Sequence, residues 1–259
     1  MSFCLGIKVA DGLVALADTR ITTGSERITA RKLNTYAEGS GRFFVMTSGL
    51  RSVRDKVLTY FEEERANQTT TSDRLFKVVN RFAALIRRVA TEDKAHLAAD
   101  GLSFNSHVLI GGQLSEDSEH KLYLIYPPGN WIEVGDSSPY QIIGTTSYGK
   151  PVIDRVLTYD DTIEVALKVG VLSFDSTRIS AADVGFPIDV ALYRRNTFTL
   201  VEHRYELEEL TEITSWWQDR LRSTLAELPD SWIGSLLSQL PPSPAPSPGR
   251  APRATDSSP

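Results

Sequence analysis

Hydrophobic and polar residues alternate in two short segments at the beginning of the chain. Residues 3–9 alternate as a half-buried strand does, and residues 13–17 form a second apolar run after the turn-forming pair Asp11-Gly12. A second pair of strand-like segments, residues 32–37 and 43–47, surrounds a turn rich in glycine. These patterns predict two hairpins, so that four strands precede the first helix.

Helical spacing begins after this region. Residues 52–65 have a helical pattern, and from Asp73 onward apolar residues recur at intervals of three and four. The remaining predicted elements are strands at residues 106–112, 120–126 and 140–143, helices at 148–157 and 161–174, and a last hairpin of residues 186–193 and 197–205.

The order of these elements predicts the fold class. Strands, two helices, strands, two helices and strands follow one another, which suits two packed sheets that are covered by helices on both outer faces. We therefore expect an α+β protein, a four-layer α-β-β-α sandwich, over residues 1–206. Over residues 207–240 we expect a C-terminal helical extension that packs on the domain or on a neighbouring subunit. Residues 241–259 are rich in Pro and Ser and predict a disordered tail.

Composition limits the function classes. The chain has 259 residues, a net charge of −5 and no long basic run, so neither nucleic acid nor an anionic membrane surface is an expected partner. No segment approaches the roughly 18 apolar residues needed to cross a membrane, and no export signal is evident, so we expect a cytoplasmic protein. Cys4 is the only cysteine and lies among alternating apolar residues, which predicts a buried thiol.

Metal and cofactor sites have no support in the sequence. The four histidines lie far apart and have no ligand spacing, which argues against zinc. Gly111-Gly112 opens a polar loop rather than a helix, and no phosphate-binding glycine pattern occurs, so we expect neither a metal nor a cofactor.

Ser2 is the first candidate for chemistry. A serine hydroxyl needs a base within hydrogen-bond reach, and a free N-terminal amine, with a pKa of about 7.7–8.0, can be that base. Initiator methionine is normally removed before a small residue, so Met1 followed by Ser2 permits Ser2 to become the first residue. Because the first predicted strand starts at Phe3, Ser2 would be fixed on a rigid sheet, as catalytic geometry requires. Ordinary start-site processing is the alternative interpretation.

Asp18 and Lys32 are the second candidate pair. The aspartate ends one predicted strand and the lysine begins the next. If the two side chains lie beneath Ser2, a buried ammonium could favour removal of the hydroxyl proton. The alternative is an ordinary turn with a surface ion pair.

Several of these residues together resemble the proteasome β-subunit pattern in order and approximate spacing. Within that superfamily the chain looks most like Anbu, the bacterial ancestral β-subunit branch, which also starts directly after methionine without a propeptide. The similarity covers about residues 2–240. The residues that carry it are Ser2, Asp18-Thr19-Arg20 with Thr22 and Gly24, Lys32, Ser48-Gly49, and the stretches 144–151, 175–180 and 184–187.

The resemblance implies roles for four residues near the start of the chain. Ser2 would supply both the nucleophilic Oγ and the free amine, where proteasome subunits use threonine. Asp18 and Lys32 would orient and polarise the nucleophile. The Gly49 N–H would hold the oxyanion, as suits a glycine that lets substrate approach the backbone.

The resemblance also implies supporting groups near the free amine, with alternatives. Either Thr145 or Ser147 fits the position of the first hydroxyl. Asp175 together with Ser180 fits the later acid and hydroxyl, and Asp183 competes with Asp175 for the acid.

The function implied by the resemblance is that of an N-terminal-nucleophile hydrolase, a threonine/serine-type peptidase that cleaves peptide or protein substrates through an acyl-enzyme on Ser2. Assembly into a homo-oligomeric ring or an open helical ring is also implied. One alternative is a catalytically silent or weak ring-forming assembly subunit. Another is an amidase of the same fold that acts on small or isopeptide substrates. The sequence does not indicate whether an unfoldase partner exists.

Overall fold

The computed structural model describes residues 2–23 and 26–241. Met1, Gly24, Ser25 and residues 242–259, which include nearly all of the predicted tail, lie outside this described part. The chain divides into two compact units, Met1–Ser215 and Trp216–Pro259.

The first unit contains two five-stranded antiparallel sheets. The first sheet has the strand order β10-β1-β2-β11-β12, and the second has the order β5-β6-β7-β8-β9. Strands of the first sheet are β1 (Phe3–Val9), β2 (Gly12–Asp18), β10 (Tyr140–Gly144), β11 (Ile188–Arg194) and β12 (Leu200–Tyr205). Strands of the second are β5 (Leu33–Glu38), β6 (Gly41–Gly49), β7 (Ser106–Gln113), β8 (Lys121–Ile125) and β9 (Trp131–Glu133).

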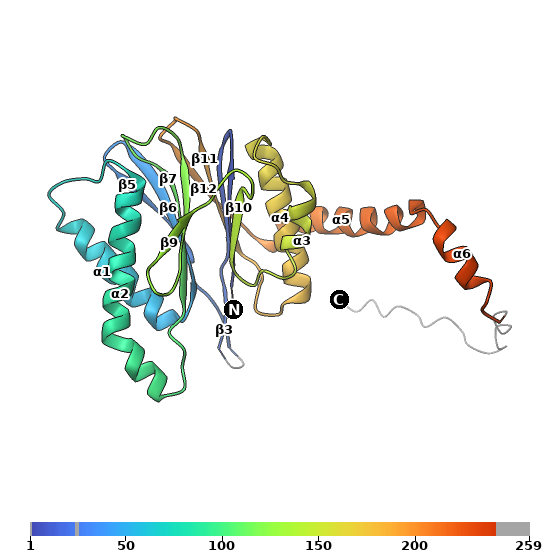
Figure 1. Ribbon diagram of the computed structural model, residues 1–259, viewed down its shortest axis with the longest axis horizontal. Helices are drawn as coiled ribbons and strands as arrows, with labels where there is room; N and C mark the ends of the chain where they lie inside the picture. The colour runs from blue at the N-terminus through green and yellow to red at the C-terminus, as the bar shows by residue number, and fades with distance from the viewer. Residues whose placement is uncertain (1, 24–25, 242–259) are drawn as a thin grey trace. The chain divides into compact units, whose positions relative to one another are not determined.

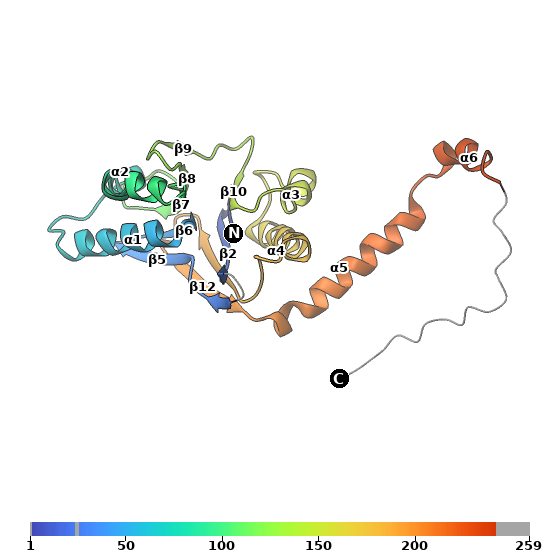
Figure 2. The same cartoon turned by 90° about the horizontal axis from the view of Figure 1, so that it is seen from below.

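Helices cover both sheets from outside, as Figures 1 and 2 show. The second sheet is covered by α1 (Arg51–Ala66) and α2 (Leu75–Ala99), and the first by α3 (Lys150–Val156) and α4 (Ile163–Ser180). The layers are therefore α-β-β-α, and the predicted fold class is confirmed.

Three apolar cores hold these layers together, one between each pair of neighbouring layers. Strand β2 contributes side chains to two of these cores, one on each face of the sheet. Val14 and Leu16 pack towards the helices of the first sheet, whereas Leu13, Ala15 and Ala17 pack between the two sheets. A strand that is buried on both faces needs apolar residues at every position, which explains the run after Gly12.

The structure departs from the predicted elements at three places. A short two-stranded hairpin, β3 (Arg20–Thr23) with β4 (Glu26–Thr29), and the strand β9 are additional. Helix α4 continues to Ser180, six residues beyond the predicted end at Phe174. The hydroxyls of Ser176 and Thr177 donate to the backbone carbonyls of Leu172 and Ser173, one turn earlier, so these polar side chains are accommodated within the helix.

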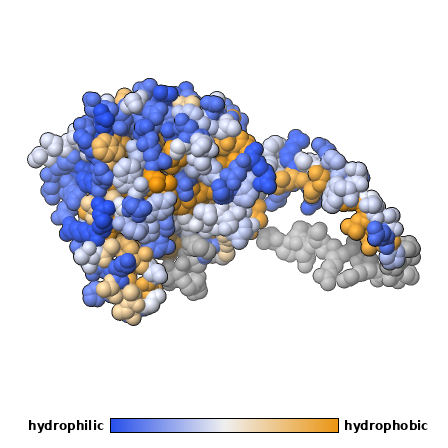
Figure 3. All heavy atoms as spheres, viewed as in Figure 1, coloured by the Kyte–Doolittle hydropathy of each residue, from blue (hydrophilic) through white to orange (hydrophobic). Residues whose placement is uncertain are grey.

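The second unit begins within α5 (Leu207–Glu227) and also contains α6 (Ser231–Leu237). Hydrophobic residues are visible on the surface of both helices in Figure 3. The exposed apolar side chains include Trp216, Leu225 and Trp232, at 51%, 70% and 68% of their full accessible area. Whether the predicted extension packs on the domain or on another subunit stays a prediction. None of the helices in the described part of the chain is long and apolar enough to cross a membrane.

Two valines in one row of the first sheet test the account of its core. Val14 and Val201 both lie opposite Leu192, but Val14 is fully buried whereas Val201 is 59% exposed. We expect Val14→Ala to lower the free energy of unfolding by about 2 kcal/mol or more. The matched change Val201→Ala should stay within about 0.5 kcal/mol. Urea unfolding of the two variants measures both, and equal losses would contradict this packing.

Candidate active site

The β3–β4 hairpin brings two charged residues together. Asp18 ends β2 in the first sheet, and Lys32 immediately precedes β5 in the second. At the base of the hairpin, the Ala30 N–H donates to the Thr19 carbonyl at 2.8 Å. The hairpin therefore returns the chain to its starting point, and residues 14 positions apart become neighbours.

Asp18 and Lys32 form a buried ion pair. Lys32 Nζ lies 2.6 Å from Asp18 Oδ1, and the two residues are 2% and 0% exposed respectively. Burial raises the pKa of the Asp18 carboxyl, whereas the Lys32 ammonium and the Phe3 N–H oppose that rise. Lys32 also donates to the Arg20 carbonyl at 2.7 Å. An ammonium has three donors, so one N–H has no protein partner among the described residues.

The backbone around Ser2 is fixed from two sides. The Phe3 N–H donates to Asp18 Oδ1 at 2.7 Å, and the Thr145 N–H donates to the Ser2 carbonyl at 2.7 Å. Gly144 has φ of +92°, and a Cβ there would lie 2.0 Å from the Ser2 carbonyl oxygen. Only glycine allows β10 to approach the start of β1 this closely.

A second serine contacts the Ser2 side chain. Ser2 Oγ and Ser48 Oγ share a hydrogen bond of 3.0 Å. The next residue, Gly49, ends β6 with φ of +135°, and a Cβ there would lie 2.2 Å from the Asn105 carbonyl oxygen. Both the backbone angle and the space therefore require glycine at position 49.

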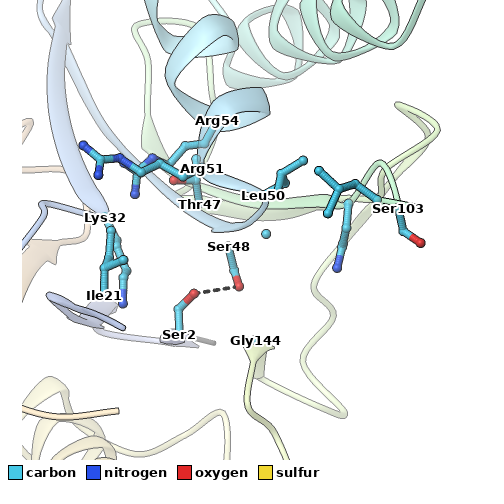
Figure 4. A pocket seen from close by; sticks show the side chains of 13 residues that line it. Ser2, Ile21, Lys32, Thr47, Ser48, Leu50, Arg51, Arg54, Ser103 and Gly144 are labelled. Carbon is cyan, nitrogen blue, oxygen red and sulfur yellow. Dashed lines mark hydrogen bonds between the residues drawn. The ribbon is translucent and has the colours of Figure 1, made fainter. Parts of the chain in front are cut away.

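These residues line one cavity of about 550 Å³, shown in Figure 4. It lies where β6 leads into α1, and Ser2 and Ser48 are joined by the dashed hydrogen bond. The lining residues are Ser2, Ile21, Lys32, Thr47, Ser48, Gly49, Leu50, Arg51, Arg54, Leu102, Ser103, Asn105 and Gly144.

The groups that were expected near the free amine of Ser2 do not all lie beside Ser2. Thr145 is buried beside Ser2, whereas Ser147 is exposed. Asp175 is buried within α4 and pairs there with Arg178 at 2.7 Å and with Thr214 at 2.8 Å.

Neither Asp175 nor Ser180, which is exposed at the end of α4, lines the cavity. The reason is that both belong to a helix longer than predicted. The competing acid, Asp183, lies in the loop after that helix. This loop contacts the segment that follows β2, since Arg20 donates to the Ala182 carbonyl at 3.2 Å.

Sequence reasoning did not assign roles to Ser48, Arg51 and Arg54. In the sequence pattern, Ser48 stands out only together with Gly49. Arg51 and Arg54 stand three residues apart at the beginning of α1, where acidic residues usually stabilise a helix. Two cations at this position are unusual, and the sequence therefore contains a signal that they have a role other than helix stability.

Other chemistries have less support at this site. Cys4 is buried, and burial raises the pKa of its thiol to about 12, so the reactive thiolate is scarce at neutral pH. Among residues 2–23 and 26–241, no group of three or more His, Cys, Asp or Glu side chains is placed to hold a metal ion.

Comparison with known proteins gives the class to which this fold and site belong. The family model described as "Proteasome subunit" matches residues 2–192, and the chain therefore belongs to the proteasome subunit family. A search of curated proteins finds no match.

Solved structures of Anbu are similar over most of the chain. The Anbu (ancestral beta-subunit) structure from Yersinia bercovieri has 28% identity and a TM-score of 0.81, and the match covers 88% of this chain and 97% of that one. The Anbu complex from Pseudomonas aeruginosa, described as a helical assembly, has 29% identity and a TM-score of 0.82, with 88% and 97% covered. A Gly-1 mutant of Anbu from Hyphomicrobium sp. strain MC1 has 29% identity and a TM-score of 0.81, with 88% and 98% covered. These matches confirm the resemblance to Anbu.

The buried ion pair makes a prediction about stability. Asp18→Asn or Lys32→Met alone leaves a buried charge without its partner, so each should lower the free energy of unfolding by about 3–5 kcal/mol. The double variant leaves no unpaired charge and should lose much less than the sum of the two.

Urea unfolding at one protein concentration measures this coupling. The exposed pair Lys168 and Glu164 on α4 is the control, and its double variant should be nearly additive. Additive losses at Asp18 and Lys32 would contradict the ion pair.

Proposed function

We propose that this chain is an N-terminal-nucleophile hydrolase that cleaves peptide bonds with Ser2 as nucleophile. The single observation that carries the proposal is the buried Lys32–Asp18 pair beside a cavity that also receives the Ser2 hydroxyl. Asp18 binds the N–H of the residue that follows Ser2, so the same carboxylate holds both the lysine and the start of β1.

The mechanism requires Ser2 to be the first residue of the mature protein. Its α-amine then takes the Oγ proton, and Oγ attacks the carbonyl carbon of the scissile bond. The Lys32 ammonium, with one N–H left over, stabilises negative charge on Oγ. The Gly49 N–H stabilises the oxyanion that forms on the carbonyl oxygen.

The second half of the cycle returns the protons. The C–N bond breaks, the leaving amine takes the proton from the α-ammonium, and the acyl group remains on Ser2 Oγ as an ester. Water then gives a proton to the α-amine and attacks the ester. Ser2 Oγ leaves with that proton, which restores the enzyme.

Two pairs of residues compete for the positions around the amine, and in each pair the contacts favour one residue. Thr145 is buried and its N–H binds the Ser2 carbonyl, which supports Thr145 over Ser147. The loop that carries Asp183 contacts the segment after Asp18, which supports Asp183 over Asp175 as the acid. Asp175 and Ser180 therefore have no role in the proposed mechanism.

Self-association is part of the proposed function. The similar Anbu from Pseudomonas aeruginosa is described as a helical assembly. Trp216, Leu225 and Trp232 are exposed here, and such apolar side chains commonly mark contacts between proteins. We propose that they contact another copy of this chain. The cytoplasmic location stays a prediction from the sequence.

A covalent probe tests the nucleophile. We expect a peptide-like β-lactone to add one acyl group to the protein and to attach at Ser2. Ser2→Ala should remove the labelling, whereas Ser138→Ala, at an exposed serine outside the cavity, should retain it. Mass spectrometry of the intact protein and of its peptides reads the result. Labelling that survives in Ser2→Ala would contradict the assignment, and absence of both labelling and turnover would favour an assembly subunit.

Ser48 makes a separate kinetic prediction. Serine lacks the methyl group that restricts the rotamers of threonine, and the Ser48 hydroxyl holds Ser2 Oγ instead. One such bond contributes about 0.5–1.5 kcal/mol, so Ser48→Ala should lower kcat by roughly 2- to 10-fold with little change in KM. Ser48→Thr keeps the hydroxyl and should retain most of kcat. An unchanged kcat in Ser48→Ala would show that this contact does not position the nucleophile.

A further inference from the structure

We propose that Arg51 and Arg54 make the cavity beside Ser2 a binding site for a substrate carboxylate, so that peptides with an acidic side chain next to the scissile bond are preferred. The position of that bond rests on the proposed function. Binding of the carboxylate does not require turnover.

Both arginines contribute to the wall of the cavity. They belong to the first turn of α1, which starts two residues after Gly49. Figure 4 shows their side chains extending from α1 towards the side of the cavity where Ile21 and Lys32 lie. Arg54 is only 9% exposed, so its guanidinium is held in place by the protein and largely shielded from solvent.

The charges around the cavity do not balance. Of its thirteen lining residues, three are cationic and none is Asp or Glu. Lys32 is neutralised by Asp18. Arg51 and Arg54 share a single carboxylate, that of Asp55, which lies 3.3 Å from Arg51 Nε and 2.7 Å from Arg54 Nη2. Among the described residues, two guanidinium groups thus have one acidic partner, and one positive charge is left over.

A carboxylate is the group that this arrangement fits. A guanidinium presents parallel N–H donors that match the two oxygens of a carboxylate. The apolar residues Ile21, Leu50 and Leu102 can cover the methylene groups of an acidic side chain. The Asp55 carboxyl is half-exposed, so water can solvate it when a substrate carboxylate takes its place on Arg54. A neutral side chain would instead leave the two guanidinium groups with Asp55 as their one carboxylate partner, so it would gain no such charge pairing.

Helix stability does not explain the two arginines. Cations in the first turn oppose the positive end of the helix dipole, and the first turn of α1 has no acidic residue. The pair therefore concentrates positive potential on the cavity.

Peptide binding to the full-length Ser2→Ala variant tests the proposal without hydrolysis. Three fluorescent peptides differ only in one residue or in the terminus: Glu with an amidated C-terminus, Gln with an amidated C-terminus, and Gln with a free C-terminal carboxylate. Fluorescence anisotropy should show the Glu peptide binding on the order of 10-fold more tightly than the amidated Gln peptide. That preference should decrease as salt is added. The third peptide shows whether a terminal carboxylate is accepted in the same way.

Substitutions identify the residues responsible. Arg54→Gln and Arg51→Gln should each reduce the preference. Asp55→Asn should increase it several-fold because both guanidinium groups lose their competitor. Arg155→Gln, at an exposed arginine of α3 outside the cavity, changes the net charge equally and should have no effect. If Arg54→Gln does not fold, the opposite effects of Arg51→Gln and Asp55→Asn decide the question.

Equal binding of all three peptides, or a preference that survives in Arg51→Gln and is unchanged in Asp55→Asn, would overturn the proposal. Hydrolysis by the unsubstituted protein separates this result from the proposed function. Preferential binding without cleavage would leave the carboxylate site standing and the hydrolase contradicted. Cleavage without any preference for an acidic peptide would support the hydrolase and contradict the carboxylate site.

Discussion

The buried ion pair of Lys32 and Asp18 is the interaction on which the rest of the site depends. Neither charge could lie in this interior alone, because desolvation of an isolated ion costs several kcal/mol. The pair joins the end of a strand in one sheet to the beginning of a strand in the other. The same Asp18 oxygen also accepts the Phe3 N–H, so the two sheets and the start of the chain are fixed at one point.

This constraint explains why small residues surround the site. With β1 held by Asp18, β10 approaches the Ser2 backbone closely and has glycine there, Gly144, while the end of β6 approaches the Asn105 backbone closely and has glycine there, Gly49. Ser48 then restrains the Ser2 hydroxyl, while Arg51 and Arg54 supply the positive charge of the cavity wall. In the proposed enzyme, the ends of rigid strands therefore supply the catalytic groups, and the adjoining helix supplies selectivity.

Much of this could be predicted from the sequence, for physical reasons that particular elements illustrate. Strands buried on both faces, such as β2, produce apolar runs, and a charged residue that ends such a run is conspicuous, as Asp18 is. The β3–β4 hairpin was missed because its strands are only four residues long. The hydrophobic pattern predicts an end of α4 that is too early, because the hydrogen bonds from the Ser176 and Thr177 side chains to the helix backbone do not alter that pattern. The directions of Ser48 and Arg54 depend on packing between distant segments, which one sequence does not reveal.

The central claim is that the amine of Ser2 itself acts as the base, with the Lys32–Asp18 pair beside it. The most direct test is the identity of the N-terminal residue of the purified protein, measured by intact mass and by sequencing of the N-terminal peptide. This account predicts that Met1 is absent and that Ser2 carries a free amine. A protein that retains Met1 would contradict it, since the base would then be part of a peptide bond.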